Sequence, residues 1–247
     1  MMNSKMILLS LRFRLFENVD LSRVPGLAKF RAAVDAIQDR RNKTAIKLVY
    51  LTASWPSEVV TEVSPADRGR TSPYGRFLTW GFQDIAGEKA FVISLMCPRR
   101  KAKAGTGDRV VRRAVGIPVR PLYEPWTRDL IYWVRDHGGK LSVELTQQRL
   151  GQIVRQELSE LSHRISTKSL RQYRLVHLAK HYDFEPYDLT AYAGRSLCSG
   201  PVRMLISRRM DIHSRSALRD YFPKLLRPIY EVAPSRYTQS LESETED

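Results

Sequence analysis

The spacing of apolar residues changes twice along this chain, and that change constrains the fold more than any other feature. Near the start, apolar residues recur at the three- and four-residue intervals of an amphipathic helix. This spacing predicts three successive helices, over 25–41, 44–54 and 57–63. Pro56 suits the first turn of the third helix, where a missing backbone N–H costs nothing. We expect residues 64–76 to form a polar loop.

The middle of the chain has the pattern of strands instead. Runs of aromatic and β-branched residues predict three antiparallel strands, over 77–82, 89–96 and 110–119. Helical spacing then returns and predicts further helices over 126–137, 145–161, 168–182, 186–192 and 214–226. A mainly helical chain with a small three-stranded antiparallel sheet belongs to the α+β fold class.

The length of 247 residues allows one or two domains with a full-sized core. We expect an N-terminal helical extension over 1–40, one α+β domain over 41–228 and a tail over 229–247. The last eight residues of that tail hold four acids and no base, so we expect the tail to be acidic and disordered.

Several classes of protein are excluded by composition. Cys97 and Cys198 are too few for a disulfide scaffold or a four-cysteine zinc site. No apolar run approaches the ~20 residues of a membrane helix. Arg12 and Arg14 interrupt the apolar start before any cleavage-like site, so we expect no secretory signal. A cytoplasmic protein without metal, cofactor or membrane partner is the expectation.

Positive charge is the clearest indication of a partner. Lys plus Arg number 41 against 26 Asp plus Glu, which gives a formal net charge of +15, and 30 of the bases are Arg. The guanidinium group binds phosphate through two parallel hydrogen bonds, and phosphate neutralisation releases condensed counterions. The segment 99–113 carries seven bases against the single acid Asp108. This pattern favours nucleic acid, although a solvated basic surface remains an alternative.

Three segments carry a family resemblance. They read LVYLTASWPSEV at 48–59, LRQYRLVHL at 170–178 and DLTAYAGRSL at 188–197. In this order and separation, over about 44–227, they resemble the catalytic domain of the tyrosine recombinases, the family of phage and archaeal integrases. The resemblance implies that fold and a metal-free reaction in which a tyrosine attacks a DNA phosphate. Two arginines hold the phosphate, histidines assist and a lysine on a β-hairpin protonates the leaving hydroxyl.

The family's catalytic positions are mostly substituted here. Arg171 retains the arginine of the second segment, but Trp55 occupies the position of the first arginine. Lys168 and Gln172 stand where the second segment has histidines, and Arg195 where the third has histidine or tryptophan. The hairpin lysine is either Lys101 or Lys103, and the sequence does not choose between them.

The position of the nucleophile is also altered. The family places its tyrosine near residues 203–206, which contain none, and the next tyrosine is Tyr221, about four helical turns later. Core packing explains Tyr221 better than nucleophilic attack, because apolar residues flank it. Loss of several transition-state contacts removes most of an enzyme's rate enhancement. The resemblance therefore predicts a fold that has lost strand cleavage.

The predicted function is a DNA-binding protein on a recombinase fold, associated with DNA in the cytoplasm. Duplex DNA is the expected partner, with self-association or an active recombinase as further possibilities. We expect the DNA-binding residues to be Arg99, Arg100, Lys101, Lys103, Arg112, Arg113, Lys168, Arg171, Arg174, Arg195 and Arg203.

Two other functions stay open at this point. The first is an active recombinase with Tyr221 as a displaced nucleophile, and the second is a module that binds RNA or an acidic protein. Arg171 has a structural alternative in an ion pair with an acid such as Asp188. We expect Trp55 and His177 to be core residues, with base stacking as the lesser alternative for Trp55.

Overall fold

The structure, a computed structural model, describes residues 24–62, 74–98, 110–162, 164–194 and 216–232. The α-helices there are α2 (Leu27–Asp35), α3 (Arg40–Thr52), α4 (Trp126–Asp136), α5 (Gln147–Glu157), α6 (Thr167–His181), α7 (Pro186–Ala193), α9 (Ser216–Tyr221) and α10 (Ile229–Val232). The strands are β1 (Val60–Glu62), β2 (Thr79–Ile85), β3 (Glu88–Pro98), β4 (Val110–Pro118) and β5 (Val143–Thr146). Short 3-10 turns are η2 (Pro56–Glu58), η4 (Gly75–Phe77) and η5 (Phe222–Leu225).

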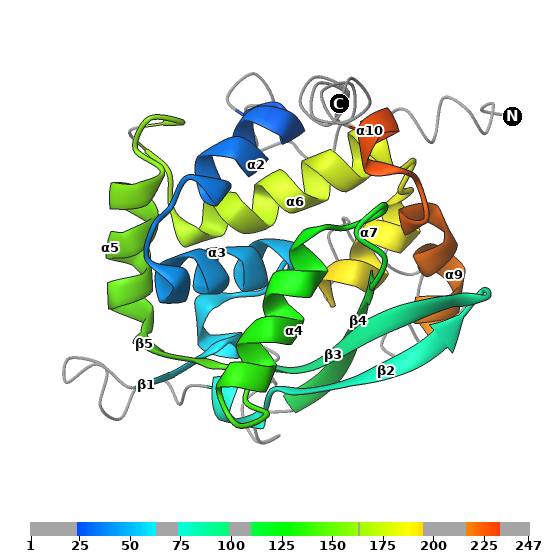
Figure 1. Cartoon of the computed structure of the whole chain (residues 1–247). Helices are drawn as coiled ribbons and strands as arrows, with labels where there is room; N and C mark the ends of the chain where they lie inside the picture. The colour runs from blue at the N-terminus through cyan, green and yellow to red at the C-terminus, as the bar shows by residue number, and fades with distance from the viewer. Residues whose placement is uncertain (1–23, 63–73, 99–109, 163, 195–215, 233–247) are drawn as a thin grey trace, which may run out of the picture.

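Helix α3 is the centre of the helical part, and α2, α4, α5 and α6 pack around it (Figure 1). It begins at a cap in which the Asp39 carboxylate accepts a 2.8 Å hydrogen bond from the backbone N–H of Asn42. It ends at Ala53, which adopts the left-handed conformation with φ 45°. The residues from Thr44 to Thr52 are all buried, so this helix is surrounded by core on every side.

The three-stranded antiparallel sheet that the sequence predicts is confirmed, although β2 and β3 are longer than expected and β4 ends one residue earlier. Its order is β2-β3-β4, with Phe82 opposite Phe91 and Phe91 opposite Ile117. Ala86 and Gly87, at φ 53° and 78°, turn the chain between β2 and β3. Two central residues with positive φ are typical of the tight turns that match the twist of a hairpin. Together with the helices, the sheet confirms the α+β class.

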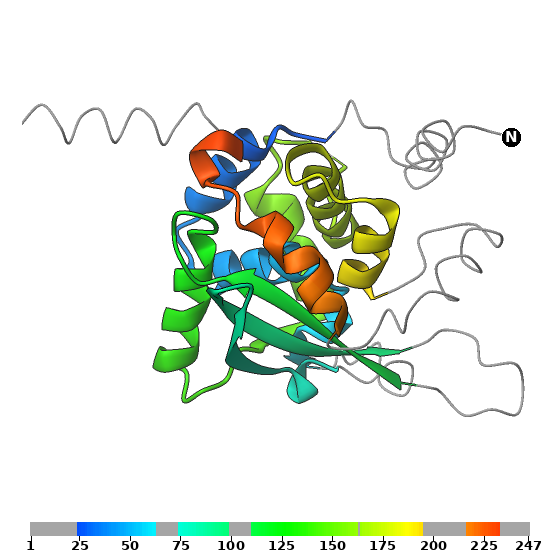
Figure 2. The ribbon, with the colours of Figure 1, turned by 90° about the vertical axis from the view of Figure 1, so that its right-hand side faces the viewer.

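The two faces of the sheet have different neighbours. Phe91, Ile93 and Val115 point into the core and are fully buried. On the opposite face, α9 and η5 lie over β4 (Figure 2). A Cβ atom at Gly116 would stand 3.2 Å from atoms of both Leu218 and Phe222. Glycine at this position therefore permits the close approach of α9 and η5 to the strand.

A second, parallel sheet of two strands was not predicted. β1 pairs with β5, with Val60 opposite Val143 and Glu62 opposite Thr146. The predicted helix over 57–63 is therefore wrong, because the chain makes only the turn η2 before it extends. The predicted helix over 145–161 begins later, at Gln147, because the Thr146 hydroxyl caps it by accepting from the backbone N–H of Arg149 at 3.0 Å.

The first and last described elements both lie against the body of the molecule. In α2, Phe30 and Val34 are fully buried, and the Phe30 ring lies 4.6 Å from that of Tyr50. α2 ends at Asp35, before the predicted end at residue 41. α10 covers the first residues of the predicted tail, and 233–247 lie outside the described residues, so the domain boundaries stay predictions. Within the described ranges, no helix is long and apolar enough to cross a membrane.

Candidate nucleic-acid interface

The described parts of the segments 48–59, 170–178 and 188–197 meet in space. The first forms the end of α3 and the turn η2, the second lies in α6, and the third forms the end of α7. Arg171 of α6 connects them, because its Nη1 donates to the carbonyl oxygen of Ala53 and its Nη2 donates to that of Ala193 at 3.3 Å. The left-handed residues Ala53 and Gly194 end α3 and α7 at this point, which leaves these carbonyl groups available to the guanidinium.

Arg171 is placed differently from the sequence-based expectation. Its side chain is buried, and its guanidinium carbon lies 5.3 Å from the centre of the Trp55 ring, a cation–π contact. The guanidinium group thus binds main-chain carbonyl oxygens where a phosphate contact was expected. The alternative partner Asp188 is also elsewhere, since its carboxylate accepts from Lys224 Nζ at 2.6 Å and caps α7 through the N–H of Glu185 at 2.8 Å.

Arg113 corrects a second expectation. It was expected to face DNA from the hairpin, yet it is buried at 2% exposure. Its Nη1 donates to the carbonyl oxygens of Thr52 and Tyr192 at 2.8 and 2.7 Å. Its Nη2 lies 3.2 Å from the carboxylate of Glu58, which is fully buried. Arg113 therefore ties β4 to the ends of α3 and α7 and to η2.

Arg174 is the third predicted DNA contact that lies in the interior. Its guanidinium group is surrounded by the rings of Tyr50, Tyr182 and Tyr192, at 5.3 to 5.9 Å. It donates to the hydroxyl of Tyr192 at 3.1 Å and lies 3.7 Å from the carboxylate of Glu124. Burial raises the pKa of Tyr50 and Tyr192, so these rings surround the cation as neutral phenols.

A second arginine neutralises the same buried carboxylate. Arg31 donates to both oxygens of Glu124 at 2.8 Å, in a bidentate pair that is buried on both sides. Glu124 thus stands between the two guanidinium groups of Arg31 and Arg174. This cluster fixes α2 and α6 to the segment before α4 and faces the core, so it belongs to the scaffold of the site.

His177 is a core histidine, as the sequence predicts. Its Nδ1 accepts from the hydroxyl of Tyr50 and its Nε2 donates to the carbonyl oxygen of Pro25, both at 2.8 Å. This pairing fits a neutral ring with the proton on Nε2. Burial lowers the pKa of His177 to about 3. The hydrogen bond to Pro25 links the segment before α2 to α6.

Tyr221 is unsuited to nucleophilic attack in this structure. The residue is buried, with 1% exposure. Its hydroxyl donates to the carbonyl oxygen of Ala114 at 3.4 Å and accepts from the N–H of Gly116 at 3.3 Å. Burial raises its pKa, which disfavours the phenolate that would attack phosphorus. Core packing, the explanation favoured from the sequence, accounts for this tyrosine.

Other predicted DNA contacts remain at the surface or outside the described residues. Arg112 and Lys168 are exposed, and no described acid forms an ion pair with either. Arg99, Arg100, Lys101, Lys103, Arg195 and Arg203 lie outside the described ranges.

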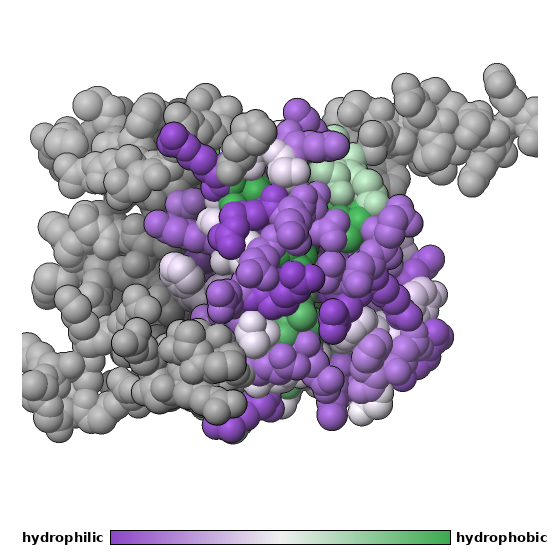
Figure 3. Space-filling model, turned by 90° about the vertical axis from the view of Figure 1, so that its left-hand side faces the viewer, coloured by the Kyte–Doolittle hydropathy of each residue, from purple (hydrophilic) through white to green (hydrophobic). Residues whose placement is uncertain are grey.

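Sequence reasoning missed two exposed bases on α5. Arg149 and Arg155 are exposed, and hydrophilic residues dominate the face of the molecule that carries α5 (Figure 3). The available signal was the helical spacing of α5, which puts Leu150, Ile153 and Val154 inside and the arginines outside.

The end of β3, the start of β4 and the end of α7 lie on one side of the molecule, away from α4 (Figure 2). β3 and β4 remain paired as far as Pro98 and Val110, so the basic segment 99–109 connects the two strands on this side. Gly194, at the end of α7, lies against Arg113 of β4. The predicted DNA contacts 99–103 and Arg195 are therefore attached to neighbouring ends of the fold.

Comparisons with known proteins identify no relative. No protein-family model, no curated protein and no solved structure matches this chain. Within the part of the chain that the structure describes, no group of three or more His, Cys, Asp or Glu is placed to hold a metal ion.

Proposed function

We propose that this chain binds duplex DNA on a fold like that of the tyrosine recombinases and does not cleave the strands. One observation carries the proposal: the connection 99–109 between the paired ends of β3 and β4 holds five bases and one acid. A concentrated positive charge on a hairpin is suited to the phosphates of a duplex, and it adds to a net charge of +15.

The interior of the candidate site supports binding without cleavage. Arg171, the one arginine retained from the family pattern, donates to the carbonyl groups of Ala53 and Ala193. Trp55 replaces the other phosphate-binding arginine, and its indole cannot form two charged hydrogen bonds to a phosphate. Tyr221 is buried behind β4. The residues that would do chemistry in a recombinase act here as packing and hydrogen-bonding groups.

Duplex binding is measured by fluorescence anisotropy across a salt series. One variant removes four charges from the hairpin connection, through Arg99→Gln, Arg100→Gln, Lys101→Gln and Lys103→Gln. A matched control removes four exposed charges on and beside α4, through Arg120→Gln, Arg128→Gln, Arg135→Gln and Lys140→Gln. If all four hairpin bases contact phosphate, their loss lowers the slope of log K against log salt by about 3 to 4. The control variant keeps the wild-type slope.

Three outcomes would contradict the proposal. Equal losses in the two variants would show that the hairpin connection has no special role. Tighter binding to a structured RNA in direct competition would favour an RNA-binding module. A covalent protein–DNA adduct on a nicked suicide substrate would favour the active recombinase. A DNA-binding role places the protein on DNA in the cytoplasm, alone, self-associated or beside an active recombinase.

A further inference from the structure

The outer edge of β2 presents main-chain groups that point away from the sheet. The sheet runs β2-β3-β4, so β2 has one neighbouring strand among the described residues. The odd-numbered residues of β3 bond to β4, as the 3.0 Å hydrogen bond from the N–H of Val119 to the carbonyl oxygen of Lys89 shows. The even-numbered residues of β3 therefore bond to alternate positions of β2, from 79 to 85. The N–H and C=O groups of Trp80, Phe82 and Asp84 are left to point outward.

This edge lacks the usual protection of an open strand. In the part of the chain that the structure describes, the outward main-chain groups of Trp80, Phe82 and Asp84 form no hydrogen bond. Natural proteins usually protect such an edge with Lys or Pro, or cover it. The sequence of β2, TWGFQDI, contains no Lys, Arg or Pro and one charge, that of Asp84. An edge with this composition is suited to pairing with another strand.

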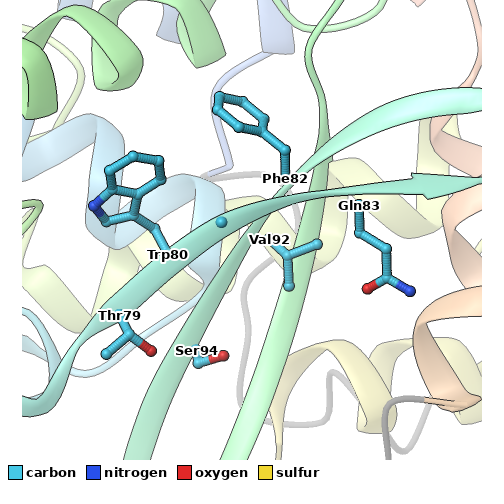
Figure 4. Close-up of a pocket in the computed structure, with 7 residues that line it drawn as sticks. Thr79, Trp80, Phe82, Gln83, Val92 and Ser94 are labelled. Atoms are coloured by element: carbon cyan, nitrogen blue, oxygen red, sulfur yellow. The ribbon is translucent and has the colours of Figure 1, made fainter.

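The two sides of β2 differ in polarity. Trp80 and Phe82 project to one side, whereas Thr79 and Gln83 project to the other (Figure 4). The two aromatic side chains are 37% and 46% exposed, and their ring centroids lie 5.9 Å apart. The Trp80 ring is held in place because its Nε1 donates to the carbonyl oxygen of Gly139 at 2.7 Å. The open edge therefore has an aromatic side and a polar side.

The aromatic side continues the core face of the sheet. Phe91 and Ile93 of β3 lie opposite Phe82 and Trp80, and both residues of β3 are fully buried. Complete burial of this face thus ends one strand before the sheet does. A strand added beyond β2 would extend the apolar face and remove the exposed rings from water.

A second copy of β2 is complementary to the first in one antiparallel register. Positions 80 and 82 are symmetric about Gly81, so a pairing centred on this glycine puts Trp80 of each copy opposite Phe82 of the other. Thr79 of each copy then lies opposite Gln83 on the polar side. Trp80 and Phe82 are also residues whose main-chain groups point outward, so they form hydrogen-bonded pairs in this register. Cross-strand aromatic pairs stabilise such a sheet.

The charges are compatible with this register. Antiparallel pairing brings the start of one β2 beside the end of the other. Arg76, which precedes β2, and Asp84, near its end, are both exposed, so unlike charges approach each other on both sides of the two-fold axis. Asp84 would lie opposite Leu78, and no like charges would face each other. A pairing centred on Phe82 would instead put Asp84 opposite Trp80.

We propose that two copies of this chain associate through the outer edge of β2, in an antiparallel pair centred on Gly81. The two three-stranded sheets then form one continuous sheet with a two-fold axis at that glycine. Such a contact uses the same surface of both copies and leaves neither β2 edge open. Because a single strand from each copy forms the contact, we expect a weak dimer whose population depends on concentration.

Disulfide trapping of the full chain tests the register. In a background with Cys97→Ser and Cys198→Ser, the variant Gly81→Cys puts two thiols on the two-fold axis, where opposed Cα atoms lie within disulfide reach. An added Cβ at Gly81 meets no atom within 4 Å. Thr79→Cys is the matched control, because the two copies of residue 79 would lie about 14 Å apart along the strands. With oxidised glutathione, we expect at least about tenfold more linked dimer from Gly81→Cys, since only its thiols meet the geometry of a disulfide.

Sedimentation velocity over about a hundredfold range of concentration measures the association itself. We expect the wild type to pass from monomer to dimer. Phe82→Pro removes an outward N–H and an aromatic ring but no hydrogen bond between β2 and β3, and it is expected to remain a monomer. Leu122→Ser is the control, because Leu122 is 43% exposed outside the strand, and it is expected to dimerise as the wild type does. Hydrogen exchange at Val115 and Ile117 reports whether each variant keeps its core.

Several results would overturn the proposal. They are a wild type that stays monomeric at every concentration, equal trapping of Gly81→Cys and Thr79→Cys, and an unchanged dimer in Phe82→Pro, which would place the contact on another surface. Protected amides of Trp80, Phe82 and Asp84 in a monomer would also overturn it, because a segment of the same chain would then cover the edge. No DNA is present, so the result is independent of the proposed function.

Discussion

Arg113 lies directly beneath Gly194. A Cβ atom added to residue 194 would stand 2.1 Å from the Cδ atom of Arg113, a distance that non-bonded carbon atoms do not reach. Gly194 also has a φ of 66°, a conformation that costs other residues energy. The last turn of α7 can therefore close over the buried arginine only if residue 194 has no side chain.

Two glycine substitutions separate the cost of a positive φ from the cost of the contact with Arg113. Gly194→Ala is expected to lower the free energy of unfolding by about 2–4 kcal/mol, from backbone strain and from overpacking against Arg113. Gly138→Ala is the matched control, because Gly138 has a similar φ of 60° and no atom within 4 Å of an added Cβ. It is expected to lose only about 1 kcal/mol in the same urea titration. Equal losses would mean that the contact with Arg113 is easily relieved.

The ion pair between Arg113 and Glu58 is expected to matter far more than an exposed one. Arg113→Met leaves the buried carboxylate of Glu58 without that cation, at a cost of about 3–5 kcal/mol. Arg40→Met breaks the ion pair of Arg40 with Asp136, in which the two side chains are 55% and 32% exposed. Its loss is expected to change the free energy of unfolding far less, because water screens an exposed pair. Urea unfolding of both variants measures the difference. A loss below about 1 kcal/mol for Arg113→Met would contradict the role assigned to this arginine.

The buried histidine predicts a loss of stability in acid. The pKa of His177 is lowered to about 3 by burial, whereas an unfolded histidine titrates near 6.5. The unfolded chain therefore binds the proton first, and stability falls as pH drops below about 6.5. Between pH 7 and pH 5 this amounts to about 2 kcal/mol. The slope is read from urea unfolding at a series of pH values.

His177→Gln provides the comparison for that slope. The variant lacks the titrating ring but retains every other ionisable group, including His181, whose ring centroid lies 6.0 Å away. We expect it to be less stable than the wild type at pH 7 and to lose less stability between pH 7 and pH 5. Parallel pH profiles would show that His177 does not cause the acid sensitivity.

Tyr221→Phe distinguishes a core residue from a nucleophile. The two hydrogen bonds of its hydroxyl are long, at 3.3 and 3.4 Å, so their loss is expected to cost about 0.5–1.5 kcal/mol in unfolding. Duplex affinity is expected to stay the same, and no adduct on a nicked substrate is expected with either protein. Tyr230→Phe, at a 42% exposed tyrosine, is the control and should change neither measurement. An adduct that Tyr221→Phe abolishes would identify the nucleophile.

The elements that the sequence predicts well are those with a long, regular pattern. The strands of the three-stranded sheet and helices α4, α6 and α7 each span seven residues or more. β1 and β5 have only three and four residues, too few for a period to be recognised. Their pairing also joins segments about eighty residues apart, and no local pattern specifies such a contact.

The sequence-based prediction puts Arg113, Arg171 and Arg174 at a DNA-binding surface, whereas all three are buried. The prediction rests on their charge and leaves out the geometry of the strand or helix that carries them. Arg112 and Arg113 are neighbours in a basic segment, yet a strand turns successive side chains to opposite faces. Arg113 shares its face with Val115 and Ile117, which are fully buried, and this alternation was visible in the sequence. Arg171 and Arg174 lie one helical turn apart on the buried side of α6. The hydrogen-bond acceptors that make their burial possible come from distant segments.

The parallel pairing of β1 with β5 also has a consequence for the order of folding. Val60 reaches Val143 only after the chain between them has passed through the whole three-stranded sheet and α4. Closing such a long loop costs conformational entropy before the contact forms. The three-stranded sheet and α4 are thus an insertion between β1 and β5 in the sequence. We expect the pairing of β1 with β5 to form late in folding. Mutations in β1 or β5 would then raise the unfolding rate more than they lower the folding rate.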